Sequence, residues 1–292
     1  MEKNLYIDAS HPNETRIVLK SNNSIEEYEF EDKNNLNFKN NIYLATVSRV
    51  EPSLQAAFVN FGRDRHGFLA FNDIQSDYYQ LPSEDKERIR IAEEEIRENL
   101  KDTGVEFSQE GAQTETPINT DEENNKVDIS DNNKNIINEK KDYREKVKSS
   151  FGIKRYKIQE VVKPGQVILI QVIKEERGQK GAALTTFISL AGKYMVLMPN
   201  TPKGGGISRK IFNSSDRNKI RSILNEIDIP KSMGVIVRTA GANKTKNEIE
   251  KDFQNTLNTW EQIRDKALDS NAPSLVYEEG DIIKRTLRDT YD

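Results

Sequence analysis

The chain has 292 residues and a net charge of −4, with 35% hydrophobic and 32% charged residues, which is enough for one large domain or two small ones. It contains no cysteine and only two histidines, which excludes disulfides, thiol catalysis and thiolate or histidine-rich metal sites. No stretch approaches the roughly 20 apolar residues that span a bilayer, and the N-terminus shows no targeting segment, so we expect a cytoplasmic protein.

The negative charge is concentrated in one segment. Residues 84–140 hold 17 acidic and 8 basic side chains, a net of −9, whereas the other 235 residues carry +5. The stretch 101–140 has Phe107 as its only aromatic residue, so it buries too little apolar surface to offset its ordering entropy. We therefore expect a disordered acidic insert over 84–148, and the net charge does not argue against a nucleic-acid partner.

The front half of the chain reads as short strands. Three runs in the first 31 residues, LYIDA, RIVLK and EYEF, are separated by the turn-prone sequences HPNE and SNNS, which predicts a small antiparallel meander. Five more strand-like runs follow, interrupted by the insert: NIYLATVSRVE, QAAFVNFG, HGFLAF, GQVILIQVIKE and AALTTFISL. Five short strands with one long interruption indicate a small β-barrel.

The back half alternates strands and helices. YMVLMP and GVIVRTAG predict strands, and SSDRNKIRSILNEI predicts a helix capped by Ser214 or Ser215. Thr245 and Glu248 have the spacing of a capping box before a long helix. The apolar face of that helix recurs every three or four residues, at Ile249, Phe253, Leu257, Trp260, Ile263 and Ala267. A short strand, SLVY, and a helix, DIIKRTLRDTYD, complete an α/β back half.

Aromatic side chains of the barrel are candidates for binding single-stranded nucleic acid, because bases stack on rings while cations follow the phosphates. Strand alternation in AAFVNFG places Phe58 and Phe61 on opposite faces, and we expect Phe58 and Phe68 to be the exposed rings. Gly62 and Gly67 lie close by and are expected to leave room for a ligand. The alternative is that all the phenylalanines fill the barrel, where this residue is usually found.

Cations also gather after the fourth barrel strand. Lys174, Arg177 and Lys180 have a spacing that lines the exit loop of that strand, as expected for side chains that follow a phosphate backbone. Glu175 and Glu176 lie between them and cancel much of the local field. An ordinary solvated hairpin tip therefore explains the same pattern.

A second group of candidates lies in the α/β half. It comprises Gly192, Val196, the loop PKGGGISRK with Arg209, and the strand-end pair Arg238 and Thr239. An arginine fork, a hydroxyl and bare backbone amides suit phosphate oxygens, although the glycine loop lacks the order of a Walker loop. A flexible glycine turn and an arginine satisfied at a sheet edge are the structural alternatives.

The stretches NIYLATVSRVEPSLQAAFVNFGRDRHGFLAFNDI and KEERGQKGAALTTFISLAGKYMVLMPNTPKGGGISRK resemble the ribonuclease E/G family of bacterial endoribonucleases, and the likeness continues through GVIVRTAG to IIKRTLRD. The resemblance implies an α+β fold, with an OB-fold barrel inserted in a split RNase H-like subdomain and followed by an α/β 5′-sensor subdomain. The implied boundaries are 1–39 for the first RNase H-like part, 40–186 for the barrel with its insert, 187–280 for the sensor and 281–292 for the start of the second RNase H-like part.

The resemblance also implies roles for individual residues. Phe58 and Phe68 match base-stacking phenylalanines of the family's barrel, and Lys174 and Lys180 match its RNA-contacting lysines. The family's pocket for a 5′-monophosphate is matched by Gly192, Val196, Arg209, Arg238 and Thr239. The family's catalytic subdomain, with aspartates that hold magnesium, and the zinc link that joins its homotetramers lie downstream of Asp292. We therefore expect no catalytic residue, no metal site and no tetramer in this chain.

The resemblance implies that this chain is the RNA-binding and 5′-monophosphate-sensing part of an endoribonuclease that cleaves single-stranded RNA in mRNA decay and in rRNA and tRNA processing. We expect RNA binding without cleavage, in the cytoplasm or at the periphery of the inner membrane. Two alternatives remain open from the sequence: a stand-alone RNA-binding regulatory protein and an inactive gene fragment.

Overall fold

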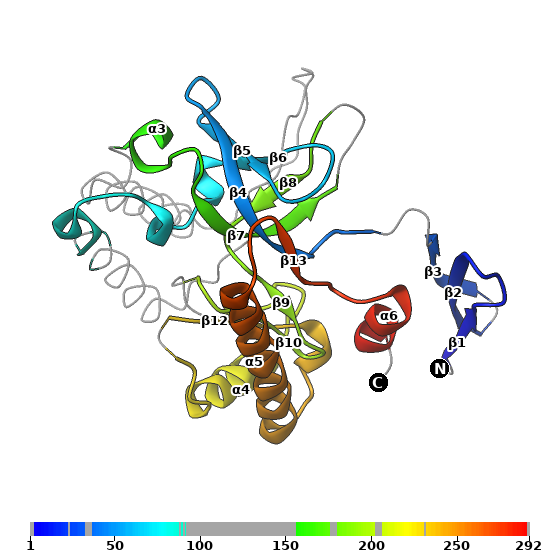
Figure 1. The fold of residues 1–292 in the computed structure, drawn as a ribbon. Helices are drawn as coiled ribbons and strands as arrows, with labels where there is room; N and C mark the ends of the chain where they lie inside the picture. The colour runs from blue at the N-terminus through cyan, green and yellow to red at the C-terminus, as the bar shows by residue number, and fades with distance from the viewer. Residues whose placement is uncertain are drawn as a thin grey trace, which may run out of the picture.

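The computed structural model describes residues 3–22, 24–32, 37–87, 89, 91, 156–175, 180–201, 206–230 and 232–290. Most of the acidic insert lies outside these residues, so its disorder stays a prediction. The described residues form three β-sheets and the helices that pack against them (Figure 1). The fold is therefore α+β, as predicted.

Five strands close on themselves to form the barrel. Their bounds are β4 (Ile42–Glu51), β5 (Ala56–Asn60), β6 (Gly67–Ala70), β7 (Val167–Lys174) and β8 (Ala183–Thr185). They pair in the order β4, β5, β6, β8, β7, and β7 pairs back with β4. Every pair is antiparallel except β6 with β8, which is parallel. This closed five-stranded arrangement confirms the predicted OB-fold barrel.

Alternating apolar side chains fill the barrel. In β5, Ala57 and Val59 are fully buried whereas Phe58 is only half-buried, which is the two-residue period of a strand with one face in the core. Phe61 is 1% exposed and makes an edge-to-face contact with Tyr43, with ring centroids 5.2 Å apart. Side chains from three short helices also join this core: η2 (Phe71–Asp73), η3 (Ser76–Tyr78) and α3 (Ile158–Val161).

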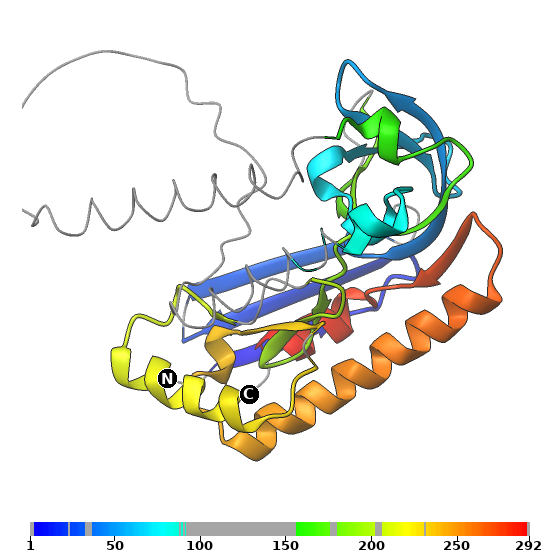
Figure 2. The ribbon, with the colours of Figure 1, turned by 90° about the vertical axis from the view of Figure 1, so that its left-hand side faces the viewer.

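A second sheet follows the barrel, and two long helices cover one of its faces (Figure 2). Its strands are β9 (Leu190–Ala191), β10 (Met195–Met198), β11 (Gly206–Ile207) and β12 (Gly234–Val237), in the order β11, β12, β10, β9. The helices are α4 (Ser214–Glu226) and α5 (Lys246–Asp269). Met195 and Leu197 pack with α5, and Ile207 and Val237 pack with α4. Val196, whose side chain alternates to the other face, is half-buried.

Both helices begin at a capping residue. Thr245 and Glu248 form the predicted capping box of α5, and the six predicted apolar residues of this helix are buried or packed against the core. The predicted cap of α4 was wrong by one or two residues. Asn213 is the N-cap, because its side-chain oxygen accepts a hydrogen bond from the backbone N–H of Ser215, and Ser214 is the first helical residue.

After α5 the chain returns to the barrel. Strand β13 (Ser274–Tyr277) pairs antiparallel with β4, so the end of the α/β half is hydrogen-bonded to the first barrel strand.

No helix in the described part of the chain is long and apolar enough to cross a membrane.

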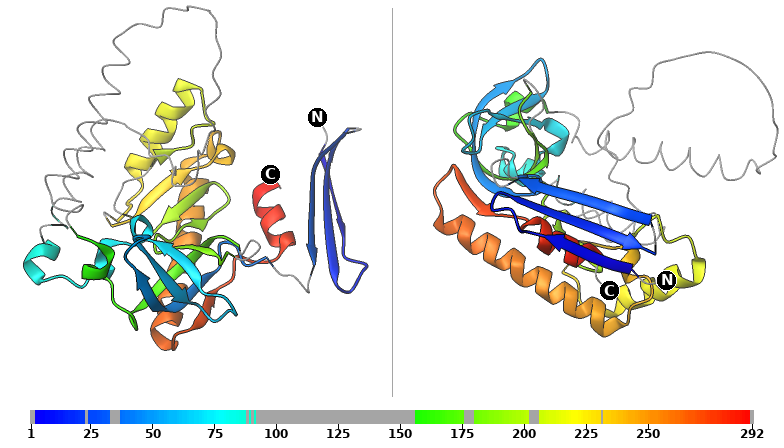
Figure 3. Two further views of the ribbon diagram at one scale, coloured as in Figure 1. Left: turned by 90° about the horizontal axis from the view of Figure 1, so that it is seen from above. Right: turned by 90° about the vertical axis from the view of Figure 1, so that its right-hand side faces the viewer.

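The two ends of the described chain lie together. The predicted meander is an antiparallel sheet of β1 (Lys3–Asp8), β2 (Glu14–Ser21) and β3 (Ser24–Asp32). Helix α6 (Ile282–Thr290) lies between this sheet and the rest of the molecule (Figure 3). Glu31 accepts a hydrogen bond from the backbone N–H of Ile282 at 3.0 Å and forms an ion pair with Arg285 at 3.2 Å. The assignment of these parts to an RNase H-like subdomain, and the predicted domain boundaries, stay predictions.

Candidate nucleic-acid interface

Five side chains form a row across the outside of the barrel. Successive strand pairings place Arg49 opposite Phe58, Phe58 opposite Phe68, Phe68 opposite Ala183, and Ala183 opposite Lys174. We call these five residues the barrel row. Because neighbouring strands lie about 4.8 Å apart, the row extends about 19 Å from one cation to the other.

The two phenylalanines at the centre of the barrel row contact each other. Their ring centroids are 6.0 Å apart and their planes make an angle of 74°, an edge-to-face arrangement. Both rings are half-buried, whereas Phe61 is in the core, so the alternative in which every phenylalanine fills the barrel is wrong. The role of Phe58 and Phe68 in base stacking stays a prediction.

Cations lie at both ends of the barrel row. The guanidinium carbon of Arg49 lies 4.4 Å from the ring centroid of Phe58, which is a cation–π contact, and Lys174 is exposed at the other end. Glu175 accepts hydrogen bonds from the backbone N–H groups of Phe38 and Lys39, at 2.6 and 3.2 Å, and so is held by the start of the barrel. Arg49 was not among the residues that the sequence predicted to bind RNA.

The glycines beside the barrel row are explained by close packing or by backbone conformation. Gly67 is buried, and a Cβ there would overlap with Leu184 inside the barrel, so the expectation that Gly67 leaves room for a ligand was wrong. Gly62 is exposed with a φ of +90°, which a turn requires. A Cβ on Gly181 would overlap with the carbonyl oxygen of His66, so two backbones approach closely there.

The last predicted lysine of the barrel, Lys180, is exposed and directly precedes Gly181. It therefore lies at the start of the segment that runs into β8, beside β6. Residues 176–179, which include Arg177 and Glu176, lie outside the described residues. The predicted RNA-contacting roles of Lys174 and Lys180 stay predictions.

The structure brings four of the five predicted phosphate-binding residues together at the ends of β10 and β12. Gly192 precedes β10 in a turn in which its N–H donates to the carbonyl of Met195, and Arg238 donates its own N–H to the carbonyl of Tyr194. Nη1 of Arg238 reaches back to the carbonyl oxygen of Gly192 at 2.9 Å. We call Gly192, Val196, Arg238 and Thr239 the Arg238 site.

The fifth predicted residue approaches the Arg238 site from the neighbouring strand. β11 pairs in parallel with β12, and Ser208, immediately before Arg209, donates its N–H to the carbonyl of Val237. Arg209 is exposed in the turn after β11. Residues 202–205 of the glycine loop lie outside the described residues. The phosphate contact of Arg209 stays a prediction.

Asp252 on α5 holds the turn of the Arg238 site. Its carboxylate accepts hydrogen bonds from the backbone N–H groups of Lys193, Tyr194 and Met195, at 3.1, 2.9 and 3.2 Å. A Cβ on Gly192 would lie 2.5 Å from Oδ2 of Asp252, so any larger residue there would have to displace this carboxylate. Sequence patterns did not indicate Asp252, because its partners are 57 to 59 residues away.

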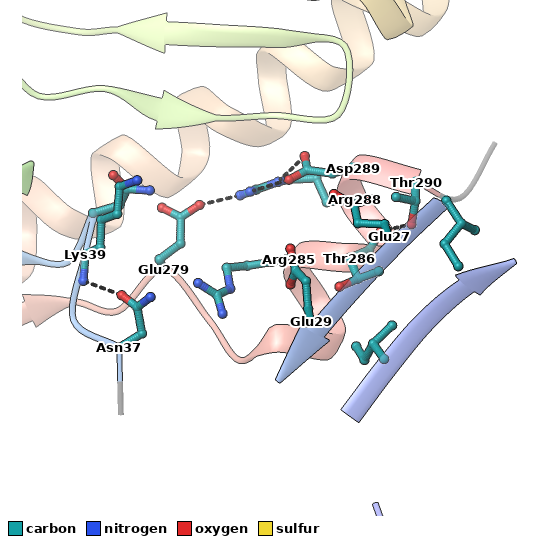
Figure 4. Close-up of a pocket in the computed structure, with 13 residues that line it drawn as sticks. Glu27, Glu29, Asn37, Lys39, Glu279, Arg285, Thr286, Arg288, Asp289 and Thr290 are labelled. Carbon is teal, nitrogen blue, oxygen red and sulfur yellow. Dashed lines mark hydrogen bonds and ion pairs between the residues drawn. The ribbon is translucent and has the colours of Figure 1, made fainter. Parts of the chain in front are cut away.

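Helix α6 supplies an acidic partner for Arg238. Oδ1 of Asp289 accepts a hydrogen bond from Nη1 of Arg238 at 2.6 Å, and Arg288 binds both oxygens of the same carboxylate at 3.1 and 3.2 Å. Arg288 also pairs with Glu279 at 2.6 Å (Figure 4). Asp289 was not a sequence candidate, because it is 51 residues from Arg238.

Hydrogen bonds within this network favour the ionised forms of Asp289 and Arg288. Burial alone would raise the pKa of Asp289, but hydrogen bonds from Arg288 and Arg238 outweigh it and hold the pKa below its ordinary value. Burial alone would lower the pKa of Arg288, but hydrogen bonds to Asp289 and Glu279 raise it. Asp289 and Arg288 are therefore charged at neutral pH.

A cavity of about 270 Å³ lies next to this network, between α6 and the first sheet. Figure 4 shows Glu27, Glu29 and Glu279 around it together with Arg285 and Arg288. Four carboxylates, Glu27, Glu29, Glu279 and Asp289, and three cations, Lys39, Arg285 and Arg288, line it, and none of the predicted site residues does. Among the described residues, no group of three or more His, Asp or Glu side chains could hold a metal ion. The expectation that magnesium and zinc bind elsewhere in the family's sequence stays a prediction.

Comparison with known proteins agrees with the resemblance noted in the sequence. The model of the Ribonuclease E/G family matches residues 189–292. The chain is 33% identical over 287 residues to Ribonuclease E of Haemophilus influenzae and to Ribonuclease E of Escherichia coli, in each case over 98% of this chain. It spans only 23% and 21% of these two proteins. Ribonuclease G of Haemophilus influenzae is 28% identical over 95% of this chain and 43% of its own length.

Proposed function

The chain belongs to the ribonuclease E/G family, and we propose that its described residues form the part of an endoribonuclease that holds RNA. The barrel row binds the bases and phosphates of a single strand, and the Arg238 site binds a 5′-monophosphate at the end of that strand. The observation that carries this proposal is the alignment of two aromatic rings between two cations on one outer face of the barrel.

The barrel row suits a single strand better than a duplex. Stacking on Phe58 or Phe68 requires a base whose face is free, which a base pair inside a helix does not offer. Arg49 has its guanidinium over the Phe58 ring, and Lys174 lies at the other end of the row, beyond Phe68; both cations can meet phosphates of the same strand. Ring contacts and flanking charges together favour unpaired RNA with little dependence on its sequence.

The Arg238 site suits a terminal phosphate. The side chain of Arg238 is 30% exposed, so a ligand can reach it, and Thr239, which follows, is exposed. A guanidinium fork binds two phosphate oxygens at once, and a 5′-monophosphate carries more charge and more free oxygens than an internal phosphodiester. A 5′-hydroxyl end offers no such group, so the site favours RNA that has a monophosphate end.

Binding of two matched RNAs tests the proposal. We would titrate the 292-residue chain into a short unstructured RNA labelled at its 3′ end, made either with a 5′-monophosphate or with a 5′-hydroxyl. Hydrogen bonds to charged groups contribute about 1.5–3 kcal/mol, so the monophosphate form should bind at least about tenfold more tightly. Arg238→Ala should abolish the difference, and Arg238→Lys should lose most of it because an ammonium has no fork.

The matched control is Arg221→Ala, which removes an exposed arginine from α4. It should leave the ratio of the two affinities unchanged. Equal affinity for the two RNAs, unaltered by Arg238→Ala, would contradict the 5′-phosphate role and favour a protein that binds RNA through the barrel alone. Failure of either RNA to bind would contradict the barrel role as well.

A further inference from the structure

We propose that Asp289 is a positioning residue for the Arg238 site: its carboxylate holds one nitrogen of Arg238 so that the rest of the guanidinium faces the phosphate. This inference rests on the proposed function, because it concerns the residue that would bind the 5′-monophosphate. The juxtaposition of β12 and α6 that carries it is the 2.6 Å ion pair between Arg238 and Asp289.

First, both protons of Nη1 of Arg238 are engaged in hydrogen bonds. A terminal guanidinium nitrogen carries two protons, and the structure gives each one an acceptor: the carbonyl oxygen of Gly192 at 2.9 Å and Oδ1 of Asp289 at 2.6 Å. Two anchors on one nitrogen fix the orientation of the guanidinium plane. The edge that contains Nε and Nη2 has no hydrogen-bond partner among the described residues, and this edge is a fork that suits phosphate oxygens.

The second step is the fixation of Asp289 itself. Arg288 donates Nε to Oδ1 at 3.1 Å and Nη2 to Oδ2 at 3.2 Å, so the carboxylate is held from its other side. Nη1 of Arg288 pairs with Glu279, which is 5% exposed, and also approaches the carbonyl oxygen of Ala191 at 3.3 Å. Figure 4 shows the chain of contacts from Glu279 through Arg288 to Asp289. Asp289 is therefore a fixed acceptor for Arg238 rather than a mobile surface charge.

The third step concerns the charge of Asp289, which by itself opposes the binding of an anion. Removing a carboxylate beside a phosphate site strengthens anion binding if only Coulomb energy matters. Removing an anchor lets the guanidinium rotate away and weakens binding if positioning matters. Arg288 already compensates the charge of Asp289, so we expect positioning to outweigh the charge. The two effects change the affinity for the phosphate in opposite directions. Whether removal of the carboxylate raises or lowers that affinity therefore decides between them.

The experiment compares Asp289→Ala, which removes the anchor and the charge, with Asp289→Asn, whose amide oxygen can still accept from Nη1 while the charge is gone. The readout is the ratio of affinities for the 5′-hydroxyl and 5′-monophosphate forms of one RNA. Asp289→Ala should lower the preference for the monophosphate at least fivefold, and Asp289→Asn should keep it within about twofold of the unaltered chain. Glu278→Ala, which removes an exposed carboxylate just before α6, is the matched charge control and should leave the ratio unchanged.

A rise or no change in the preference of Asp289→Ala would overturn the positioning role, since charge alone would then account for Asp289. Affinity for the 5′-hydroxyl RNA serves as the internal check of folding, because that RNA is held by the barrel. If Asp289→Ala does not fold, Arg288→Lys provides the second variant: it keeps the charge but frees the carboxylate, and should lower the preference in the same direction. An unaltered chain without any preference would overturn the proposed 5′-phosphate site itself, whereas a preference that survives both variants would overturn only the positioning role.

Discussion

Phe58 on β5 and Phe68 on β6 occupy directly opposite positions of an antiparallel pair, with ring centroids 6.0 Å apart and planes at 74°. The guanidinium of Arg49 lies over the first of these rings, 4.4 Å from its centroid. The edge-to-face geometry fixes each ring through contact with the other. The two half-buried rings and the cation lie on the outside of the closed barrel, because other side chains fill its interior, and this placement supports the proposed stacking role.

Replacing either ring of this pair should weaken RNA binding selectively. Phe58→Ala and Phe68→Ala each remove a stacking surface, for which we expect a loss of about 1–3 kcal/mol in the free energy of binding. Fluorescence anisotropy with the 5′-hydroxyl RNA measures the loss without a contribution from the Arg238 site. Thermal unfolding of each variant is followed in parallel.

Phe61→Ala is the contrasting variant for these two. Its ring is 1% exposed inside the barrel, so its removal should cost about 3–5 kcal/mol in the free energy of unfolding. Equal destabilisation by Phe58→Ala and Phe61→Ala, with no separate change in RNA affinity for the folded protein, would show that Phe58 is a core residue and contradict its stacking role.

The cations of the barrel row should appear in the salt dependence of binding. If Arg49 and Lys174 each neutralise one phosphate of a single strand, each alanine variant should reduce the slope of log affinity against log salt by about 0.7. The expected fall in affinity is therefore largest at low salt. Lys219→Ala, an exposed lysine on α4, is the control and should keep the slope. An unchanged slope for Arg49→Ala would mean that Arg49 packs on the Phe58 ring and does not neutralise a phosphate.

The barrel was predictable because its signal is local. The alternation of Ala57, Phe58 and Val59 predicts which side chains face the core, and a run of such strands indicates a barrel. Arg49 was not predictable in this way, since a bulge between Val47 and Arg49 shifts its strand by one residue relative to β5. Simple alternation along β4 therefore does not place Arg49 opposite Phe58.

The Arg238 site was predictable only in part. Gly192 and Arg238 follow from a family resemblance, whereas Asp252 contacts the turn after Gly192, and Asp289 contacts Arg238, across 51 to 59 residues of chain, and such contacts leave no periodic signal. The cap of α4 shows the same limit at short range. Ser214, Ser215 and Asn213 are all good caps by type, and only the hydrogen bond to the N–H of Ser215 decides among them.

The turn of the Arg238 site should depend on Asp252 and Gly192 together. Asp252→Ala leaves three backbone N–H groups without their acceptor, which should cost about 1–3 kcal/mol in stability and also reduce the preference for the 5′-monophosphate. Gly192→Ala should act in the same direction, because the added Cβ would lie 2.5 Å from the same carboxylate and displace it. Urea unfolding and the two-RNA titration measure the two effects. A Gly192→Ala variant that keeps full stability and full preference would contradict the close packing of this turn.

The preference for a 5′-monophosphate should fall as the pH decreases from 7.5 to 5. The second pKa of a terminal phosphate is about 6, so the group changes from a dianion to a monoanion in this range and loses attraction to Arg238. The protein side should contribute little, because the lowered pKa of Asp289 keeps its carboxylate ionised. The stability that Asp289 contributes is present above its ordinary pKa of 3.8 and is lost only as the pH falls through the lowered value, outside this window. Changes in the charge of the barrel affect both RNAs alike, so the ratio of their affinities isolates the terminal phosphate. A ratio that stays constant from pH 7.5 to 5 would contradict recognition of the phosphate dianion.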